Sequence, residues 1–142
     1  TLSEKLQQRI SDYTRQGGNL MLSGSYLGSI LPANLAQNTL KFTYGGSMYG
    51  VTTGQVFGAN TTLSFPTQVN EKSYAVPAPD CLLPTAGAYS TFVYTPGNYG
   101  AGIAYKGTDV RTFVLGFPFE SIDNAQHRSR IMRAALDLFK SK

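Results

Sequence analysis

The pair Gly17-Gly18 separates two segments of opposite character, and this junction constrains the fold more than any other feature. Upstream of it, apolar residues recur at helical spacing, which predicts an amphipathic helix: Leu2, Leu6, Ile10 and Tyr13. The pattern Thr1-Leu2-Ser3-Glu4 is typical of a capping box, with Thr1 as the cap. Downstream, Asn19-Leu20-Met21-Leu22-Ser23 is apolar without alternation, which favours a strand covered on both faces. A helix that ends at glycine and is followed by a buried strand indicates an α/β chain.

The stretch from about residue 33 to residue 87 differs from the rest of the chain. It is rich in Gly, Thr, Asn and Pro, and it has brief strand-like pieces at Lys41–Tyr44, Gln55–Phe57 and Thr62–Phe65. It shows no repeat and no cluster of charges. We interpret it as a long excursion of loops and small strands inside one domain of residues 1–142, because this length fits a single domain.

Regular patterns return in the last third of the chain. Strand-like runs occupy Ser90–Tyr94, Gly102–Tyr105 and Val110–Leu115. The turn residues between the last two runs predict a hairpin. Asp123 is the predicted N-cap of a final helix. The spacing gives this helix a broad apolar face, which consists of Ile131, Met132, Ala135, Leu136, Leu138 and Phe139.

Composition limits the classes of function. Charged residues make up only 14% of the chain, against about 25% in typical soluble domains, and this balance favours an extracytoplasmic location. The net charge is +4, yet five of the twelve Lys and Arg residues fall in the last fifteen positions and the others are scattered. No basic stripe interleaved with aromatic residues is present, so nucleic-acid binding is not predicted.

The same inventory argues against bound metals and membrane spans. One Cys and one His are too few for a structural zinc site, which needs four ligands, and a single Cys forms no internal disulfide. No apolar stretch approaches the roughly 20 residues of a membrane-spanning helix. The sequence therefore predicts no metal, no cofactor and no membrane span.

Two strand-end segments carry a resemblance to a known family. Gly24-Ser25-Tyr26-Leu27-Gly28 resembles the Gly-x-Cys-x-Gly nucleophile elbow of class I glutamine amidotransferases. Gly116-Phe117-Pro118-Phe119-Glu120 resembles their Phe-His-Pro-Glu segment, which supplies the base and its orienting carboxylate. Residue for residue, Tyr26 stands at the Cys position and Pro118 at the His position, and only Glu120 matches the family.

The longer sequences around these two segments, near both ends of the chain, are similar to amidotransferase-like domains of large secreted bacterial proteins that are often catalogued as xanthan lyases. This resemblance implies a three-layer, flavodoxin-like α/β domain with a mixed sheet, of which this chain is the C-terminal portion. The first strands of the family would lie upstream of Thr1, so we expect an excised piece of a longer, exported protein. The implied partners are a polysaccharide and the neighbouring modules of the same parent chain.

The substitutions leave little of the family's chemistry. A phenol has a pKa near 10, so Tyr26 is a poor replacement for a thiolate, and we do not expect amidotransferase activity. Cys81 lies far from the elbow in sequence and is predicted to be a small buried apolar residue. A polysaccharide lyase is the alternative, with Tyr26, Glu120 and His127 as its candidate catalytic residues. Against this reading, Glu120 is explained by its place before a helix, and Arg128, Arg130 and Arg133 by a solvated helix face.

A binding role is the leading prediction. Ligands of open α/β sheets lie beyond the carboxyl ends of the strands, where Ser25, Tyr26 and Glu120 are the candidate ligand-binding residues. Six tyrosines are candidate platforms for sugar rings: Tyr44, Tyr49, Tyr74, Tyr89, Tyr94 and Tyr99. We therefore expect a non-catalytic accessory module of a secreted polysaccharide-processing protein. A structural or subunit-contact domain is the second alternative, and it follows if the protein's own side chains fill the strand-end cleft.

Overall fold

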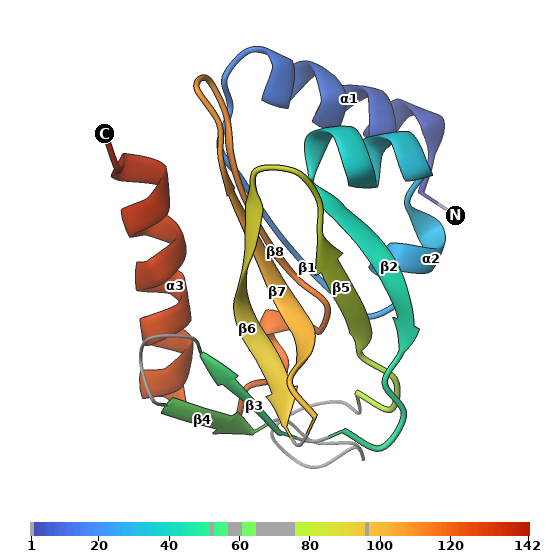
Figure 1. Ribbon diagram of the computed structural model, residues 1–142. Helices are drawn as coiled ribbons and strands as arrows, with labels where there is room; N and C mark the ends of the chain where they lie inside the picture. The colour runs from blue at the N-terminus through green and yellow to red at the C-terminus, as the bar shows by residue number, and fades with distance from the viewer. Residues whose placement is uncertain (1, 52, 57–60, 65–75, 96) are drawn as a thin grey trace.

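A computed structural model describes residues 2–51, 53–56, 61–64, 76–95 and 97–142 (Figure 1). Its main element is a six-stranded sheet in the order β1-β8-β7-β6-β3-β4, beside a two-stranded sheet of β2 and β5. In chain order the strands are β1 (Leu20–Ser23), β2 (Phe42–Ser47), β3 (Thr53–Val56), β4 (Thr61–Ser64), β5 (Asp80–Pro84), β6 (Ala88–Thr95), β7 (Tyr99–Lys106) and β8 (Arg111–Leu115). The helices are α1 (Glu4–Arg15), α2 (Leu27–Ile30) and α3 (Ala125–Lys140), with a π-helical turn η1 (Leu35–Thr39) and a 3₁₀ turn η2 (Phe119–Ser121).

Among the described strands, only β1 and β8 pair in parallel, from Leu20 opposite Thr112 to Ser23 opposite Leu115. Every other pairing in both sheets is antiparallel. The strands β6, β7 and β8 form a meander, because β7 pairs with β6 on one side and with β8 on the other. The protein is thus a mixed α/β fold whose main sheet is mostly antiparallel.

The predicted three-layer flavodoxin-like fold is wrong. That fold alternates parallel strands with helices, and a parallel connection needs a crossover of about a dozen residues or more. Here β6 ends at Thr95 and β7 begins at Tyr99, while β7 ends at Lys106 and β8 begins at Arg111. Links this short force antiparallel pairing. The apolar run of β1 predicted only a strand covered on both faces, a property that strands of either pairing can have, so it did not determine the sheet type.

The two faces of the main sheet bury separate sets of side chains. Along β8, Phe113 and Leu115 pack with α3, whereas Val114 packs on the opposite side with α1, α2 and the two-stranded sheet. Figure 1 shows α3 on one side of the strands and α1, α2 and β2 on the other. The largest fully buried side chains include Phe42, Leu82, Phe92, Tyr94 and Phe117. The six-stranded sheet therefore carries two cores, one on each face.

The helix ends differ in detail from the sequence prediction. Ser3, and not Thr1, caps α1, since its hydroxyl accepts the N–H of Leu6. Asn124, and not Asp123, caps α3, because its side-chain oxygen accepts the N–H groups of Gln126 and His127 at 2.8 and 3.2 Å. A one-residue shift of this kind follows because neighbouring polar residues compete for the same free helix N–H groups. In the part of the chain that is described, no helix is long and apolar enough to cross a membrane.

Candidate functional site

The turn after β1 is the feature around which the candidate site forms. It leads from Ser23 at the end of β1 into α2, which begins at Leu27. Tyr26 caps α2 in the left-handed backbone region, at φ 65°. This conformation costs a non-glycine residue roughly 1–2 kcal/mol. The Tyr26 side chain is 46% exposed, so the turn presents a phenol to solvent.

The carboxylate of Asp80 occupies the backbone N–H groups of this turn. One oxygen accepts the N–H of Tyr26 at 2.9 Å, and the other accepts the N–H of Gly28 at 2.8 Å. Asp80 begins β5 and is fully buried. Burial raises the pKa of the Asp80 carboxyl, while hydrogen bonds from the amides of Gly28, Tyr26 and Leu27 act in the opposite direction. The amides that could receive an anionic group of a substrate are thus already used by the protein itself.

The main chain of Asp80 is fixed as firmly as its side chain. Its N–H donates to the carbonyl of Gly116 at 2.6 Å, and its carbonyl accepts the hydroxyl of Tyr94 at 2.7 Å. A methyl group at Gly116 would overlap the carbonyl oxygen of Asp80, so only glycine permits this approach. Burial raises the pKa of the Tyr94 phenol well above its usual range, which keeps the hydroxyl neutral and able to donate. Asp80 therefore joins β5, β8 and the turn after β1 in one network.

The predicted site residues lie around this network in different environments. The N–H of Phe119 donates to the Ser23 hydroxyl at 3.3 Å, which brings η2, with the exposed Glu120, to the end of β1. The Ser25 hydroxyl is buried and has no hydrogen-bond partner among the described residues. His127 is half-buried in the first turn of α3, and its Nδ1 likewise lacks a partner there. Ser25, Tyr26 and Glu120 thus stand near one edge, whereas His127 belongs to the next helix.

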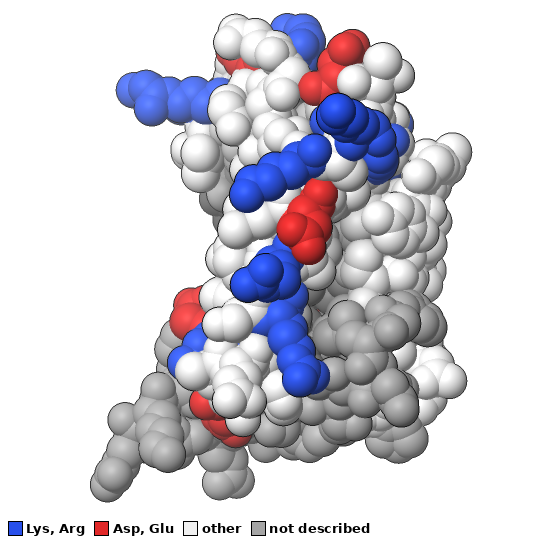
Figure 2. Space-filling view, turned by 90° about the vertical axis from the view of Figure 1, so that its left-hand side faces the viewer, with Lys and Arg blue, Asp and Glu red and all other residues white. Residues whose placement is uncertain are grey.

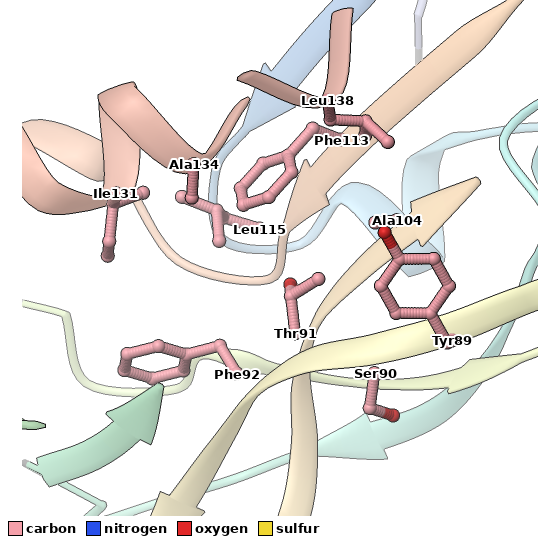
Figure 3. A pocket seen from close by; sticks show the side chains of 10 residues that line it. All are labelled: Tyr89, Ser90, Thr91, Phe92, Ala104, Phe113, Leu115, Ile131, Ala134 and Leu138. Carbon is pink, nitrogen blue, oxygen red and sulfur yellow. The ribbon is translucent and has the colours of Figure 1, made fainter. Parts of the chain in front are cut away.

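The described residues line cavities at several places, and the three that follow do not include Ser25, Tyr26, Glu120 or His127. A polar one of about 370 Å³ lies between α1, η1 and the β7–β8 hairpin. An apolar one of about 220 Å³ lies between α3 and the sheet (Figure 3). A third, of about 370 Å³, runs along the outer side of α3. No group of three or more potential metal ligands occurs within the described ranges.

The candidate tyrosine platforms are dispersed. Tyr94 is fully buried, and Tyr44 is half-buried with its ring against Gly28. Tyr49, Tyr89 and Tyr99 are 78%, 50% and 52% exposed, and they come from the turn after β2, from β6 and from β7. Tyr74 lies outside the described residues.

Sequence reasoning missed Asp80, which is the centre of the network. A signal was present, because Asp80 is one of only two acidic residues between positions 33 and 87 and directly precedes the apolar Cys81-Leu82-Leu83. An acidic residue at the start of an apolar strand indicates a buried carboxylate that needs hydrogen-bond donors. The local sequence pattern does not identify which N–H groups are the donors.

The comparisons with known proteins concern the fold. No family model matches the sequence, and no curated protein matches it. The structure is similar to the β-galactosidase of the Antarctic haloarchaeon Halorubrum lacusprofundi (TM-score 0.59, 18% identity, 96% of this chain and 20% of that one). It is also similar to the β-galactosidase of Rahnella sp. R3 (TM-score 0.58, 13% identity, 96% and 21%) and to the mmIFT52 N-terminal domain (TM-score 0.55, 13% identity, 99% and 73%).

These likenesses show the fold alone. The chain spans about a fifth of the length of the two β-galactosidases and about three quarters of the mmIFT52 domain. None of the three is described as a glutamine amidotransferase or a xanthan lyase, so the resemblance to those proteins stays a prediction. The flavodoxin-like assignment is corrected here as well, since the chain shares a mixed, mostly antiparallel architecture with these structures.

Proposed function

We propose that this chain is a non-catalytic module of a larger, exported protein that processes polysaccharide. The observation that carries the proposal is the Asp80 carboxylate on the amides of Tyr26 and Gly28. A nucleophile at such a turn needs those amides, or others like them, to stabilise an oxyanion. Because the Asp80 carboxyl group already occupies these amides and position 26 is a phenol, an acyl-transfer reaction finds neither a nucleophile nor an anion site.

The comparisons and the composition support the rest of this proposal. In two β-galactosidases a unit of this fold makes up about a fifth of the chain, which is what an accessory part of a carbohydrate-processing protein would look like. The low charged fraction of 14% is in keeping with an exported protein. Exposed tyrosines such as Tyr49 and Tyr99 offer flat surfaces to sugar rings.

A structural or subunit-contact role is the second candidate, and a specific observation favours it. The apolar cavity beside α3 opens past Tyr89 and Ala134, both of which are exposed. Figure 3 shows β6 contributing Tyr89 and Phe92 on one side, while α3 contributes Ala134 on the other. A neighbouring module could insert an apolar side chain there and bury it.

The lyase alternative needs Tyr26, Glu120 and His127 within hydrogen-bond reach around one cleft. The three cavities described above include none of these residues in their lining. The lyase therefore has less support than the module, and it serves as the main competing outcome of the experiment.

The deciding experiment combines calorimetry with an activity assay. The chain is titrated with a panel of acidic and neutral polysaccharides, including xanthan, and each mixture is then followed at the ultraviolet absorbance of unsaturated uronate. Binding heat with constant absorbance is the expected result. The variants Tyr26→Phe and His127→Ala, with Tyr13→Phe on α1 as the matched control, test for a lyase.

Three outcomes separate the candidates. An absorbance that rises with the natural chain, and stays flat with Tyr26→Phe or His127→Ala, would overturn the proposal and establish the lyase. Absence of both heat and absorbance would leave the structural role. Heat that survives in all three variants would support a binding module whose binding surface lies elsewhere than at the turn after β1.

A further inference from the structure

The outer side of α3 carries the densest group of basic residues in the chain. Five of the twelve Lys and Arg residues lie in the last fifteen positions, together with a single acidic residue, Asp137. The inner side of the helix buries Ile131, Ala135 and Leu138 against the sheet. Figure 2 shows Lys and Arg side chains following one another down this side of the molecule. Helical spacing therefore places the charges outward because the apolar residues are held inward.

These charges border a shallow groove. We define the α3 outer face by the six residues that line it: Ser129, Met132, Arg133, Leu136, Asp137 and Lys140. The groove has a volume of about 370 Å³. Leu136 is 44% exposed and offers an apolar surface within the groove. The face thus combines two cations with two apolar side chains, Met132 and Leu136, beside them.

The two cations of the α3 outer face are free to meet a ligand. Arg133 and Lys140 are exposed, and neither side chain forms a hydrogen bond or ion pair with another described residue. Other basic residues nearby have structural partners. Lys106 and Arg111 donate to the carbonyls of Lys142 and Ser141, which anchors the end of α3 to the β7–β8 hairpin.

The spacing of the free cations suggests what they bind. Arg133 and Lys140 are seven positions apart, close to two helical turns, so they lie on the same side about 10 Å apart along the axis. Asp137 lies between them and, like both cations, is exposed. A ligand that suits this arrangement has separated negative charges with neutral, partly apolar groups between them.

We infer that the α3 outer face binds an anionic polysaccharide that contains uronate residues. The carboxylates pair with Arg133 and Lys140, and the C–H face of the intervening sugar packs on Met132 and Leu136. This inference rests on the proposed function and deepens it, since it names the class of sugar and the surface that holds it.

Two other polyanions fit the α3 outer face less well. Nucleic-acid strands carry closely spaced phosphates and gain much of their affinity from bases stacked on aromatic residues, but the groove has no aromatic residue and has Asp137 at its centre. Anionic membranes bind amphipathic helices through their bulky apolar side, and in α3 that side is buried against the sheet.

The test uses polygalacturonate as the anionic probe and dextran as the neutral one, with affinity measured by calorimetry. The double variant Arg133→Glu/Lys140→Glu is expected to bind polygalacturonate about tenfold more weakly or worse, because two attractive charges become repulsive. The matched control, Lys5→Glu/Arg9→Glu, makes the same change of net charge on exposed residues of α1. It should retain affinity within about twofold, because charges outside the binding surface are screened by salt.

A third variant should change the affinity for polygalacturonate in the opposite direction. Asp137→Asn removes the only acidic side chain from the groove and is expected to strengthen binding by about two- to threefold. Binding of all variants should weaken as salt rises, and dextran should show no heat. Circular dichroism verifies that the exposed substitutions leave the fold intact.

Several results would overturn the inference. Equal losses of affinity for polygalacturonate in the α1 and α3 double variants would show that the net charge of the protein alone attracts the polysaccharide. Tighter binding of single-stranded oligothymidylate, or of vesicles containing phosphatidylserine, would assign the surface to a different polyanion. If polygalacturonate binds the natural chain and the α3 double variant equally, the site is wrong but the binding module survives. If no polysaccharide binds at all, the inference and the proposed function fail together.

Discussion

The carboxylate of Asp80 accepts the backbone N–H of Gly28 at 2.8 Å, although 52 positions separate the two residues. Its second oxygen accepts the N–H of Tyr26. These bonds tie the start of β5 to the turn between β1 and α2, and they hold Tyr26 in its left-handed conformation. The Asp80 carboxyl group thus occupies the backbone amides to which an anion could otherwise bind at this turn. The same pair of bonds makes Asp80 the residue on which the geometry of the whole edge depends.

Replacing Asp80 by alanine should destabilise the fold by about 2–5 kcal/mol, because two partly buried N–H donors lose their acceptor at a cost of about 1–3 kcal/mol each. The measurement is the free energy of unfolding in urea. The control is Asp109→Ala, which removes an exposed carboxylate and should change stability by no more than about 0.5 kcal/mol. Similar losses in both variants would contradict the role assigned to the Asp80 hydrogen bonds.

The stability contributed by Asp80 should depend on pH in an unusual direction. Burial raises its pKa in the folded protein above the usual value of about 3.9. The folded chain therefore holds this proton more tightly than the unfolded chain does. The part of the stability that depends on this proton is fully present below the unfolded pKa and is lost as pH rises through the folded pKa, whereas the hydrogen bonds to Tyr26 and Gly28 act in the opposite direction.

Unfolding in urea at a series of pH values, beginning near pH 4, tests this prediction. The comparison is with Asp80→Asn, which has a similar shape and does not titrate at this position. The free energy of unfolding of the natural chain should fall relative to that of Asp80→Asn as pH rises. A constant difference across the series would show that burial does not dominate the titration.

Local patterns predicted the elements that local interactions determine. The helix before Gly17-Gly18 and the apolar strand after it appear as α1 and β1, and the hairpin predicted across residues 106–109 joins β7 and β8. The strand-like pieces at 41–44, 55–57 and 62–65 overlap β2, β3 and β4. Each of these features depends on spacing or turn residues within a few positions, which a sequence displays directly.

Strand pairing and the centre of the site were beyond such patterns. The segment between β1 and β6 supplies β3 and β4 to the edge of the main sheet and β2 and β5 to the smaller sheet, where β5 packs across β7. No periodicity reveals which strand pairs with which. The partners of the Asp80 carboxylate lie more than 50 positions away in the sequence. Sequence reasoning found the turn at Tyr26 through its glycines, but it could not identify the carboxylate that fills it.

Gly100 should tolerate no side chain, because β5 crosses β7 at this point. A methyl group at Gly100 would overlap the carbonyl oxygen of Leu82, which belongs to the backbone and cannot rotate away. Gly100→Ala should therefore cost about 3 kcal/mol, as expected for overpacking between two sheets. The measurement is the urea midpoint together with the denaturant slope, which reports any loss of two-state unfolding.

The matched glycine for this test is Gly50. It lies in open space with φ 76°, so alanine there meets no neighbour and experiences only the left-handed backbone. Gly50→Ala should cost about 1 kcal/mol. If both variants lose equal stability, backbone conformation and not the close approach of β5 to β7 explains the need for glycine at position 100.

The Cys81 thiol should react with Ellman's reagent only when the edge around Asp80 opens. Cys81 was predicted to be a buried residue, and the structure confirms this at 4% exposure. Burial raises the pKa of the thiol, and the neighbouring Asp80 charge raises it further, so the reactive thiolate is scarce even when reagent arrives. The folded chain should react at least about a hundredfold more slowly than the chain unfolded in guanidinium, the ratio expected if opening costs about 3 kcal/mol.

Because Asp80 directly precedes Cys81 and holds β5 to the turn after β1, Asp80→Ala should accelerate the reaction, whereas Asp109→Ala should leave its rate unchanged. Rapid reaction of the natural folded chain would show that β5 is not held in the way these hydrogen bonds require.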